Sequence, residues 1–436
     1  MEKRFMIMTT LRQLSHMIFI LIISLSLTLT GCDLFSTADN DIDDPAEPFE
    51  RRELPRALSS GEMQIVDGSG AFGFELMHKL LESGPQESHF ISPLSILMAY
   101  GMTMNGAEGD TYTQMQEVFG LQEMSREEIN QAARELIGLL TEFDDDVVFN
   151  IANSIWYRDT FSVEQEFLET NRHYFDAVIE AADFDDPDTV ERINEWVNDK
   201  TEGLIEEIVE DPIDPLTVMY LINAIYFNGE WTIQFDPDDT ETKPFHRPDG
   251  TTADVNMMRI SEVENMQYTS GDDYQAVNLY YGDAGYAMTL VLPDEETGLE
   301  NWLQNKTWDD WQELTGAFGN VTLNLEMPKF ELEYEVDGFG DILQELGIVD
   351  AFDYSISDFS RINPIQDDLY ISDTRHVTFI RVDEEGTEAA AATSVEFGVT
   401  SAPQTVNLRF DRPYFYVIRE VESGAILFMG TMTDPS

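Results

Sequence analysis

The sequence predicts an α+β fold. Amphipathic helical patterns come mostly early in the 436-residue chain, as in AFGFELMHKLLE and SREEINQAARELIGLL. Segments rich in β-branched and aromatic residues become dense later, as in VTLNLEMPKFELEYEV and RFDRPYFYVIRE. Helices and strands segregated in this way are typical of α+β proteins. Because 42% of the residues are hydrophobic and no clear linker interrupts the chain after residue 60, we expect one large domain.

The net charge is unusually negative. The chain has 85 Asp and Glu residues against 24 Lys and Arg residues, which gives a formal charge of −61. So acidic a chain repels itself in dilute buffer, whereas at about 1 M salt the screening length of roughly 3 Å removes most of that repulsion. The composition therefore favours adaptation to a saline habitat over binding to a cationic partner. No basic stripe is present to meet phosphates, so we expect no nucleic-acid partner.

The N-terminus has the pattern of an export signal. Basic residues precede the apolar stretch MIFILIISLSLTL, which ends in LTGC with Cys32, the only cysteine of the chain. LTGC resembles the lipobox of bacterial lipoproteins, in which the cysteine is acylated and the preceding segment is removed. The alternative is an ordinary signal peptide or membrane anchor with an incidental cysteine. With one cysteine, the chain has no intramolecular disulfide.

These features predict three parts: a lipoprotein signal peptide over residues 1–31, an acidic flexible tether over 32–60 and the folded domain over 61–436. We therefore expect an exported lipoprotein, anchored in a membrane and facing the periplasm or the cell exterior.

No motif predicts catalysis. GSGAFG, residues 68–73, fits the dinucleotide pattern G-x-G-x-x-G and follows the strand-like MQIVD, but the next strand-like text lacks the acidic residue such a site needs. We interpret it as a glycine-loosened start of a helix. The six histidines have no metal-binding spacing, and neither a G-x-S-x-G elbow nor a P-loop is present. We expect no enzyme activity, cofactor or metal.

The segment RVDEEGTEAAAATSVEFGVTSAPQ, from Arg381 to Gln404, differs from the strand-like text on both sides of it. Its four consecutive alanines favour a helix, but an isolated helix this short is marginal in water. Read with period two, one face is small and uncharged throughout (Thr387, Ala389, Ala391, Thr393), and Gly386 precedes it as a permissive hinge. Such a segment could enter a β-sheet between two existing strands.

From about residue 61 to its end, the chain resembles the serpin family. The resemblance rests on HFISPLSILMAYGMTMNGAEGDTYTQM, LINAIYFNGEW, VDEEGTEAAAAT and FDRPYFYVIREVESGAILFMGTMTDP, in the family's order. One departure is Tyr414, where the family usually has Phe. The resemblance implies a serpin fold, with helices packed around a large mixed central β-sheet, additional smaller sheets and an exposed reactive-centre loop.

The resemblance also implies roles for individual residues. The hinge of the loop would comprise Glu384, Gly386, Thr387, Glu388, Ala389, Ala390, Ala391 and Ala392. Lys329 would pair with Glu384 near Trp231 where insertion begins, a region called the breach. Ser92, Ser95, Asn223 and His376 would form a polar cluster under the seam of the sheet, called the shutter. From the residues alone, His376 is a hydrogen-bonded core histidine on the same strand face as Thr378 and Ile380.

The position of the reactive bond stays open between two readings. Counting sixteen residues from Glu384 selects Thr400–Ser401, whereas counting back from FDRP selects Ala402. We prefer Thr400. The surrounding GVTSA is small and uncharged, which favours elastase-like or subtilisin-like targets, while Phe397 would suit a chymotrypsin-like enzyme.

The resemblance implies an irreversible suicide-substrate inhibitor of extracellular serine proteases. The expected partners are a target serine protease, bound covalently to a monomer, and a membrane reached through the lipid anchor. The alternative is a non-inhibitory serpin that acts as a surface binding or structural protein.

Overall fold

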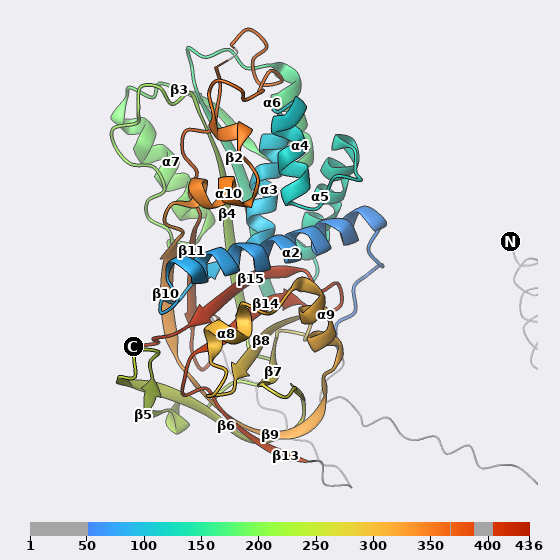
Figure 1. The fold of residues 1–436 in the computed structure, drawn as a ribbon, viewed down its shortest axis with the longest axis vertical. Coiled ribbons are helices and arrows are strands. Elements are labelled where there is room, and N and C mark those ends of the chain that lie inside the picture. The colour runs from blue at the N-terminus through green and yellow to red at the C-terminus, as the bar shows by residue number, and fades with distance from the viewer. Residues whose placement is uncertain (1–50, 367, 388–403) are drawn as a thin grey trace, which may run out of the picture. The chain divides into compact units, whose positions relative to one another are not determined.

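The computed structural model describes residues 51–366, 368–387 and 404–436 (Figure 1). Its α-helices are α2 Ser60–Ser83, α3 Pro93–Met104, α4 Gly109–Val118, α5 Arg126–Thr141, α6 Gln165–Tyr174, α7 Pro187–Lys200, α8 Leu299–Leu303, α9 Trp308–Gly316 and α10 Phe339–Leu346. No helix among these residues is long and apolar enough to cross a membrane.

The largest sheet has nine strands in the order β1-β15-β14-β8-β7-β6-β9-β13, with β5 paired to β6. Its members are β1 Phe90–Ile91, β5 Glu241–His246, β6 Thr252–Ser270, β7 Tyr274–Tyr281, β8 Tyr286–Pro293, β9 Gly319–Pro328, β13 Thr405–Arg409, β14 Tyr414–Glu420 and β15 Ile426–Met432. Strands β13 and β9 pair in parallel and the other pairs are antiparallel, so the sheet is mixed.

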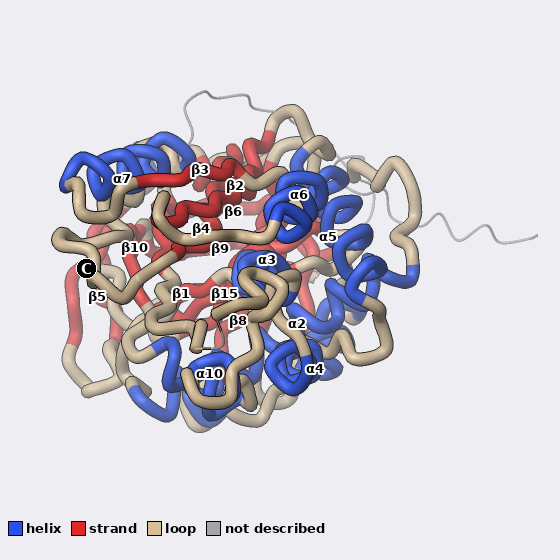
Figure 2. Tube along the Cα trace, turned by 90° about the horizontal axis from the view of Figure 1, so that it is seen from above, coloured by secondary structure: helices blue, strands red, loops and turns tan. Residues whose placement is uncertain are grey.

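Two smaller sheets carry the functional region. One has the order β12-β4-β2-β3, built from β12 Gly386–Thr387, β4 Met219–Glu230, β2 Val147–Arg158 and β3 Val178–Ala182. The other pairs β10 Phe330–Glu335 with β11 Val377–Val382. In Figure 2 the strands lie between α7 on one side and α2, α4 and α10 on the other. Helices around a large mixed sheet, with smaller sheets beside it, confirm the α+β prediction.

The glycine-rich segment is not the start of a helix. Helix α2 begins at Ser60, where Ser59 and Glu62 form a capping box, and it runs through both MQIVD and GSGAFG. The glycines serve packing instead: a Cβ at Gly68 would lie 2.1 Å from the carbonyl oxygen of Phe119, and one at Gly70 would lie 2.5 Å from the ring of Trp308. The strand reading of MQIVD was therefore wrong, because tertiary packing of α2 outweighs its local β preference.

The last residues of the expected tether contact the domain. Leu54 is buried, and its backbone N–H donates to Glu422 Oε2 at 2.7 Å. Arg56 forms a salt bridge with the buried carboxylate of Glu62 at the start of α2. Contacts with the folded body thus begin before residue 61.

Tyr414 lies in the core, as its place in the aromatic pattern suggests, but burial of its hydroxyl is unfavourable. Its side chain is fully buried, and within the described residues its hydroxyl has no hydrogen-bond partner. A buried hydroxyl without a partner costs about 1–3 kcal/mol, so phenylalanine would fit this position better.

Candidate functional site: the hinge and the seam

The hinge begins as a short strand. Gly386 pairs with Glu230 and Thr387 with Gly229 of β4, in antiparallel register. The chain reverses between β11 and β12, where the N–H of Asp383 donates to the carbonyl of Gly386 at 3.0 Å. The start of the hinge is thus already part of a sheet. The other predicted hinge residues, Glu388 to Ala392, and the candidate reactive residues Thr400, Ser401 and Ala402 lie outside the described residues, as does Cys32.

Gly386 is required for a different reason from the one the sequence suggested. Its φ angle is not in the left-handed region, so the position does not call for unusual backbone freedom. A Cβ there would lie 2.2 Å from the carbonyl oxygen of Gly229 and 2.8 Å from the Cα of Glu230. Two backbones approach too closely for any side chain, which makes glycine the residue that permits the pairing.

Thr387 occupies a buried position between the strands. It is 4% exposed, and its Oγ1 lies 2.7 Å from the hydroxyl of Tyr281. The Tyr281 ring stacks on Trp231 with centroids 4.4 Å apart, and Trp231 Nε1 donates to the carbonyl of Asp383 at 2.9 Å. The three side chains therefore connect the hinge to the end of β4.

The predicted ion pair at the breach is present. Lys329 Nζ lies 2.8 Å from Glu384 Oε2, and Thr240 Oγ1 donates to Glu384 Oε1 at 2.8 Å. Burial alone would raise the pKa of Glu384, but these hydrogen bonds and the charge of Lys329 hold that pKa below its usual value. Glu384 is therefore ionised at neutral pH, and its two oxygens hold the first residue of the hinge in place.

A narrow slot continues from Thr387 between β4 and β11. Among the described residues these two strands are not hydrogen-bonded to each other. The slot leaves about 10 Å3 for the centre of a water molecule, which is roughly the space of one water. Its walls are the side chains of Phe90, Thr201, Leu204, Ile205, Ile225, Tyr226, Phe227, Phe379, Ile380, Thr387, Ile418 and Phe428. A further strand could enter here only if β4 and β11 moved apart.

The predicted shutter residues meet below this slot. The backbone N–H of Ser92 donates to His376 Nε2 at 3.0 Å, and Ser92 Oγ donates to the carbonyl of Leu427 at 2.6 Å. The hydroxyl of Ser95 donates to Asn223 Oδ1, and Asn223 Nδ2 donates to Asn153 Oδ1 at 2.8 Å. The cluster thereby joins α3 to β4 and, through β4, to β2. It also joins His376, which precedes β11, to the start of α3.

Comparison with known proteins places the chain. The profile of the family described as "Serpin (serine protease inhibitor)" matches residues 67–435. This chain belongs to the serpin family. An uncharacterised serpin-like protein of Methanosarcina acetivorans is 31% identical over 381 residues, covering 86% of this chain and 87% of that protein. Mouse antithrombin-III is 31% identical over 401 residues, covering 89% and 85%. The crystal structure of tengpin, a thermophilic serpin, in its native state has a TM-score of 0.75 at 29% identity, covering 87% of this chain and 95% of tengpin.

Family membership confirms the predicted serpin fold. Serpins are in general inhibitors of serine proteases and not catalysts, although some do not inhibit. The geometry brings together all the described residues that the resemblance assigned to the breach and the shutter of this serpin.

Sequence reasoning missed three contributors: Tyr281, Thr240 and Asn153. Each is joined to the site by a hydrogen bond to a residue far away in the chain, at separations of 106, 144 and 70 residues. The aromatic run NLYY offered a weak signal for Tyr281 as a core residue. Nothing in the local pattern distinguished Thr240 or Asn153 from other surface or strand residues.

His376 makes the stability of this serpin depend on pH. Burial lowers its pKa to about 3, whereas an unfolded histidine titrates near 6.5. Between these values the unfolded state binds more protons, so the contribution is complete above about pH 6.5 and is lost as the pH falls toward 3. Protonation would also place a proton on Nε2, which accepts the N–H of Ser92.

We therefore expect His376→Gln to remove about 2 kcal/mol of the stability difference between pH 7 and pH 5. Denaturant unfolding of both chains at the two pH values, at equal salt, measures this. The surface carboxylates titrate equally in both chains and cancel. If the stability of the two chains fell in parallel, His376 would not be a buried neutral group.

Proposed function

We propose that this serpin is an irreversible suicide-substrate inhibitor of extracellular serine proteases. The observation that carries the proposal is the start of the hinge: Gly386 and Thr387 are already paired with β4, directly above a slot between β4 and β11. The residues that follow, from Glu388 to Ala392, include four small alanines that a closely packed sheet accepts.

In the proposed reaction, the serine hydroxyl of the protease attacks the carbonyl carbon of the reactive bond. An ester forms between the protease and the inhibitor, and the peptide bond breaks as the new amino terminus leaves with a proton. Our preferred bond is Thr400–Ser401, with Ala402 as the alternative. Water would normally hydrolyse the ester. Before this can happen, the freed hinge inserts between β4 and β11, which carries the protease away and distorts its active site.

The breach and shutter contacts support a role in timing. The Lys329–Glu384 pair and the Trp231 bond to Asp383 hold the hinge at one end of the slot. The bonds of Ser92 and Ser95 hold the seam at the other. These contacts keep the loop from inserting before it is cut, so the free energy of insertion stays available for the protease.

The target class follows from the loop sequence. GVTSA offers small uncharged side chains, which suit elastase-like and subtilisin-like enzymes better than trypsin-like ones. We further propose that Cys32 is lipidated and holds the protein at a membrane facing the periplasm or the exterior. The LTGC motif supports this placement, and mass spectrometry of the membrane fraction tests it.

The decisive experiment is incubation of the protein with purified proteases in high salt, followed by denaturing electrophoresis. The panel comprises elastase, subtilisin, chymotrypsin and trypsin, which separates the candidate target classes. The proposal requires an adduct that survives denaturation, with the mass of protease plus the loop-cleaved inhibitor. Cleavage without any adduct would instead identify a non-inhibitory serpin, which acts by binding.

A further inference from the structure

Arg52, in the chain that precedes α2, contacts both the turn between β7 and β8 and the turn before β2. The backbone N–H of Arg52 donates to the carbonyl of Asp283 at 3.0 Å, and its Nη1 lies 2.9 Å from Asp283 Oδ2. The same Nη1 lies 3.6 Å from Asp144 Oδ1, and the guanidinium sits over the ring of Phe143 at 5.9 Å. Arg52 therefore contacts two separate turns of the domain at once.

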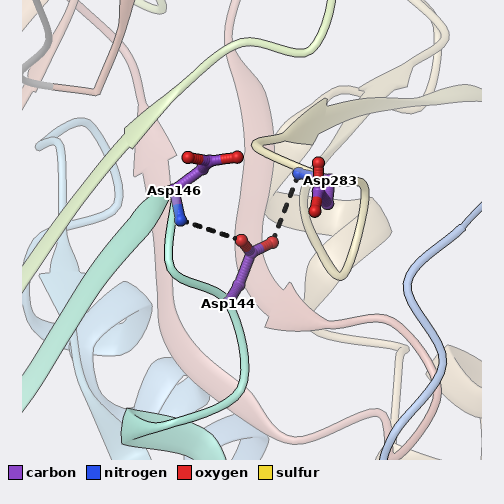
Figure 3. Close-up of side chains that lie close together, drawn as sticks. All are labelled: Asp144, Asp146 and Asp283. Carbon is purple, nitrogen blue, oxygen red and sulfur yellow. Dashed lines mark hydrogen bonds between the residues drawn. The ribbon is translucent and has the colours of Figure 1, made fainter.

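These contacts centre on a group of three carboxylates: Asp144, Asp146 and Asp283 (Figure 3). The Asp144 side chain is fully buried and accepts the backbone N–H groups of Asp146 at 3.0 Å and of Asp283 at 3.3 Å. Burial raises the pKa of Asp144, while the backbone hydrogen bonds and the charge of Arg52 oppose that rise. Three carboxylates this close repel one another unless a cation compensates them, and Arg52 supplies the positive charge.

The group joins two parts of the fold. Asp144 lies just before β2, whose first residue Val147 pairs with Gly229 of β4. Asp283 lies in the turn between β7 and β8. The N–H of Gly282 in the same turn donates to the carbonyl of Glu230, at the end of β4, at 2.9 Å.

The turn also leads directly to the hinge. Tyr281, two residues before Asp283, bonds to Thr387 and stacks on Trp231. Arg52 thus holds a joint at which the ends of β2 and β4, the β7–β8 turn and the hinge meet. Entry of a further strand between β4 and β11 requires β4 to move with β2, to which it is paired over eleven residue pairs.

We propose that Arg52 is a positioning residue that clamps this joint and slows insertion of the uncut loop. The proposal rests on the proposed inhibitory function for its purpose, but the clamp itself is a property of the intact chain. Loss of the cation leaves the three carboxylates uncompensated, so their repulsion loosens β2 from the β7–β8 turn. The segment expected to be a passive tether then takes part in controlling the hinge.

The test uses the full chain with Arg52→Ala. Intact protein is warmed without protease, and at intervals the fraction whose loop subtilisin can still cut is measured, because an inserted loop is protected. We expect Arg52→Ala to lose cleavable loop about three to ten times faster than the wild type. Arg52→Lys keeps the cation, so we expect its loss of cleavable loop to be nearly as slow as in the wild type.

Arg192→Ala is the matched control, because Arg192 forms an exposed ion pair with Glu180, away from the joint. Should Arg52→Ala fold poorly, Arg52→Gln tests the same charge, because it keeps a long polar side chain at this position without the cation, and we expect the same faster loss. Equal rates in wild type, Arg52→Ala and Arg52→Gln would overturn the clamp. This readout does not depend on adduct formation, so a wild type that is cut without forming adducts would refute the inhibitor and leave the clamp measurable.

Discussion

Thr387→Arg is expected to turn the proposed inhibitor into a substrate. Thr387 is the first hinge residue that points into the slot, and it is 4% exposed with its hydroxyl bonded to Tyr281. The uncut chain can avoid burying an arginine there by unpairing the two-residue β12, whereas an inserted hinge must bury it without a partner, at a cost of several kcal/mol. If about 3 kcal/mol of that cost is felt in the transition state, insertion slows roughly a hundredfold, and hydrolysis of the acyl-enzyme then overtakes it.

The measurement is the number of inhibitor molecules consumed per protease inactivated, together with the fraction found in adducts. We expect the adduct to fall to a few per cent while the loop is cut at an unchanged rate. Glu385→Arg is the matched control, since it places the same side chain two residues earlier at a partly exposed position. Adduct formation by Thr387→Arg at the wild-type yield would show that the hinge does not insert with this face inward.

Much of the fold is predictable from local pattern. The segments VVFNIANSIWYR, AMTLVLP and YFYVIRE are predicted as strands, and they form β2, β8 and β14. Most of their apolar side chains are buried in the sheets. The helix at SREEINQAARELIGLL is predicted from its amphipathic period, and its first turn is fixed by the capping box of Ser125 and Glu128. In these segments local preference and tertiary packing favour the same element, so the sequence pattern alone predicts it.

The failures occur where packing decides against local preference. Residues 63–73 combine a strand-like run with three glycines, yet they form the middle of α2, because the glycines allow Phe119 and Trp308 to approach the helix axis. Gly386 is similar: its position was recognised, but its reason, the close carbonyl of Gly229, lies 157 residues away in the chain. The sequence shows that a glycine is present, but it does not show which distant segment packs against that glycine.

The site was reached through a resemblance rather than through chemistry. Lys329, Trp231 and Glu384 are unremarkable separately, and only the family pattern brought them together before the geometry did. The contacts around Arg52 had no such pattern to reveal them. One arginine in an acidic, proline-bearing segment resembles solvated tether, and its partners Asp144 and Asp283 are two among 85 acidic residues.

Cleavage of the loop is expected to raise the melting temperature of the free serpin by at least about 10 °C. In the intact chain, within the described residues, the slot-facing edge of β4 is paired only at Gly229 and Glu230, and β11 is paired on one side only, with β10. An inserted strand would pair with both edges at once and would fill the slot with the small side chains that follow Thr387. Since each kcal/mol gained raises the melting temperature of a large domain by roughly 2 °C, a rise of this size requires a net gain of about 5 kcal/mol. Calorimetry of intact and loop-cut protein at the same high salt measures it, with Thr387→Arg expected to gain far less on cleavage. If cut wild type melted at the temperature of intact wild type, the strand would not enter the slot, and the energy needed to distort a protease would be missing.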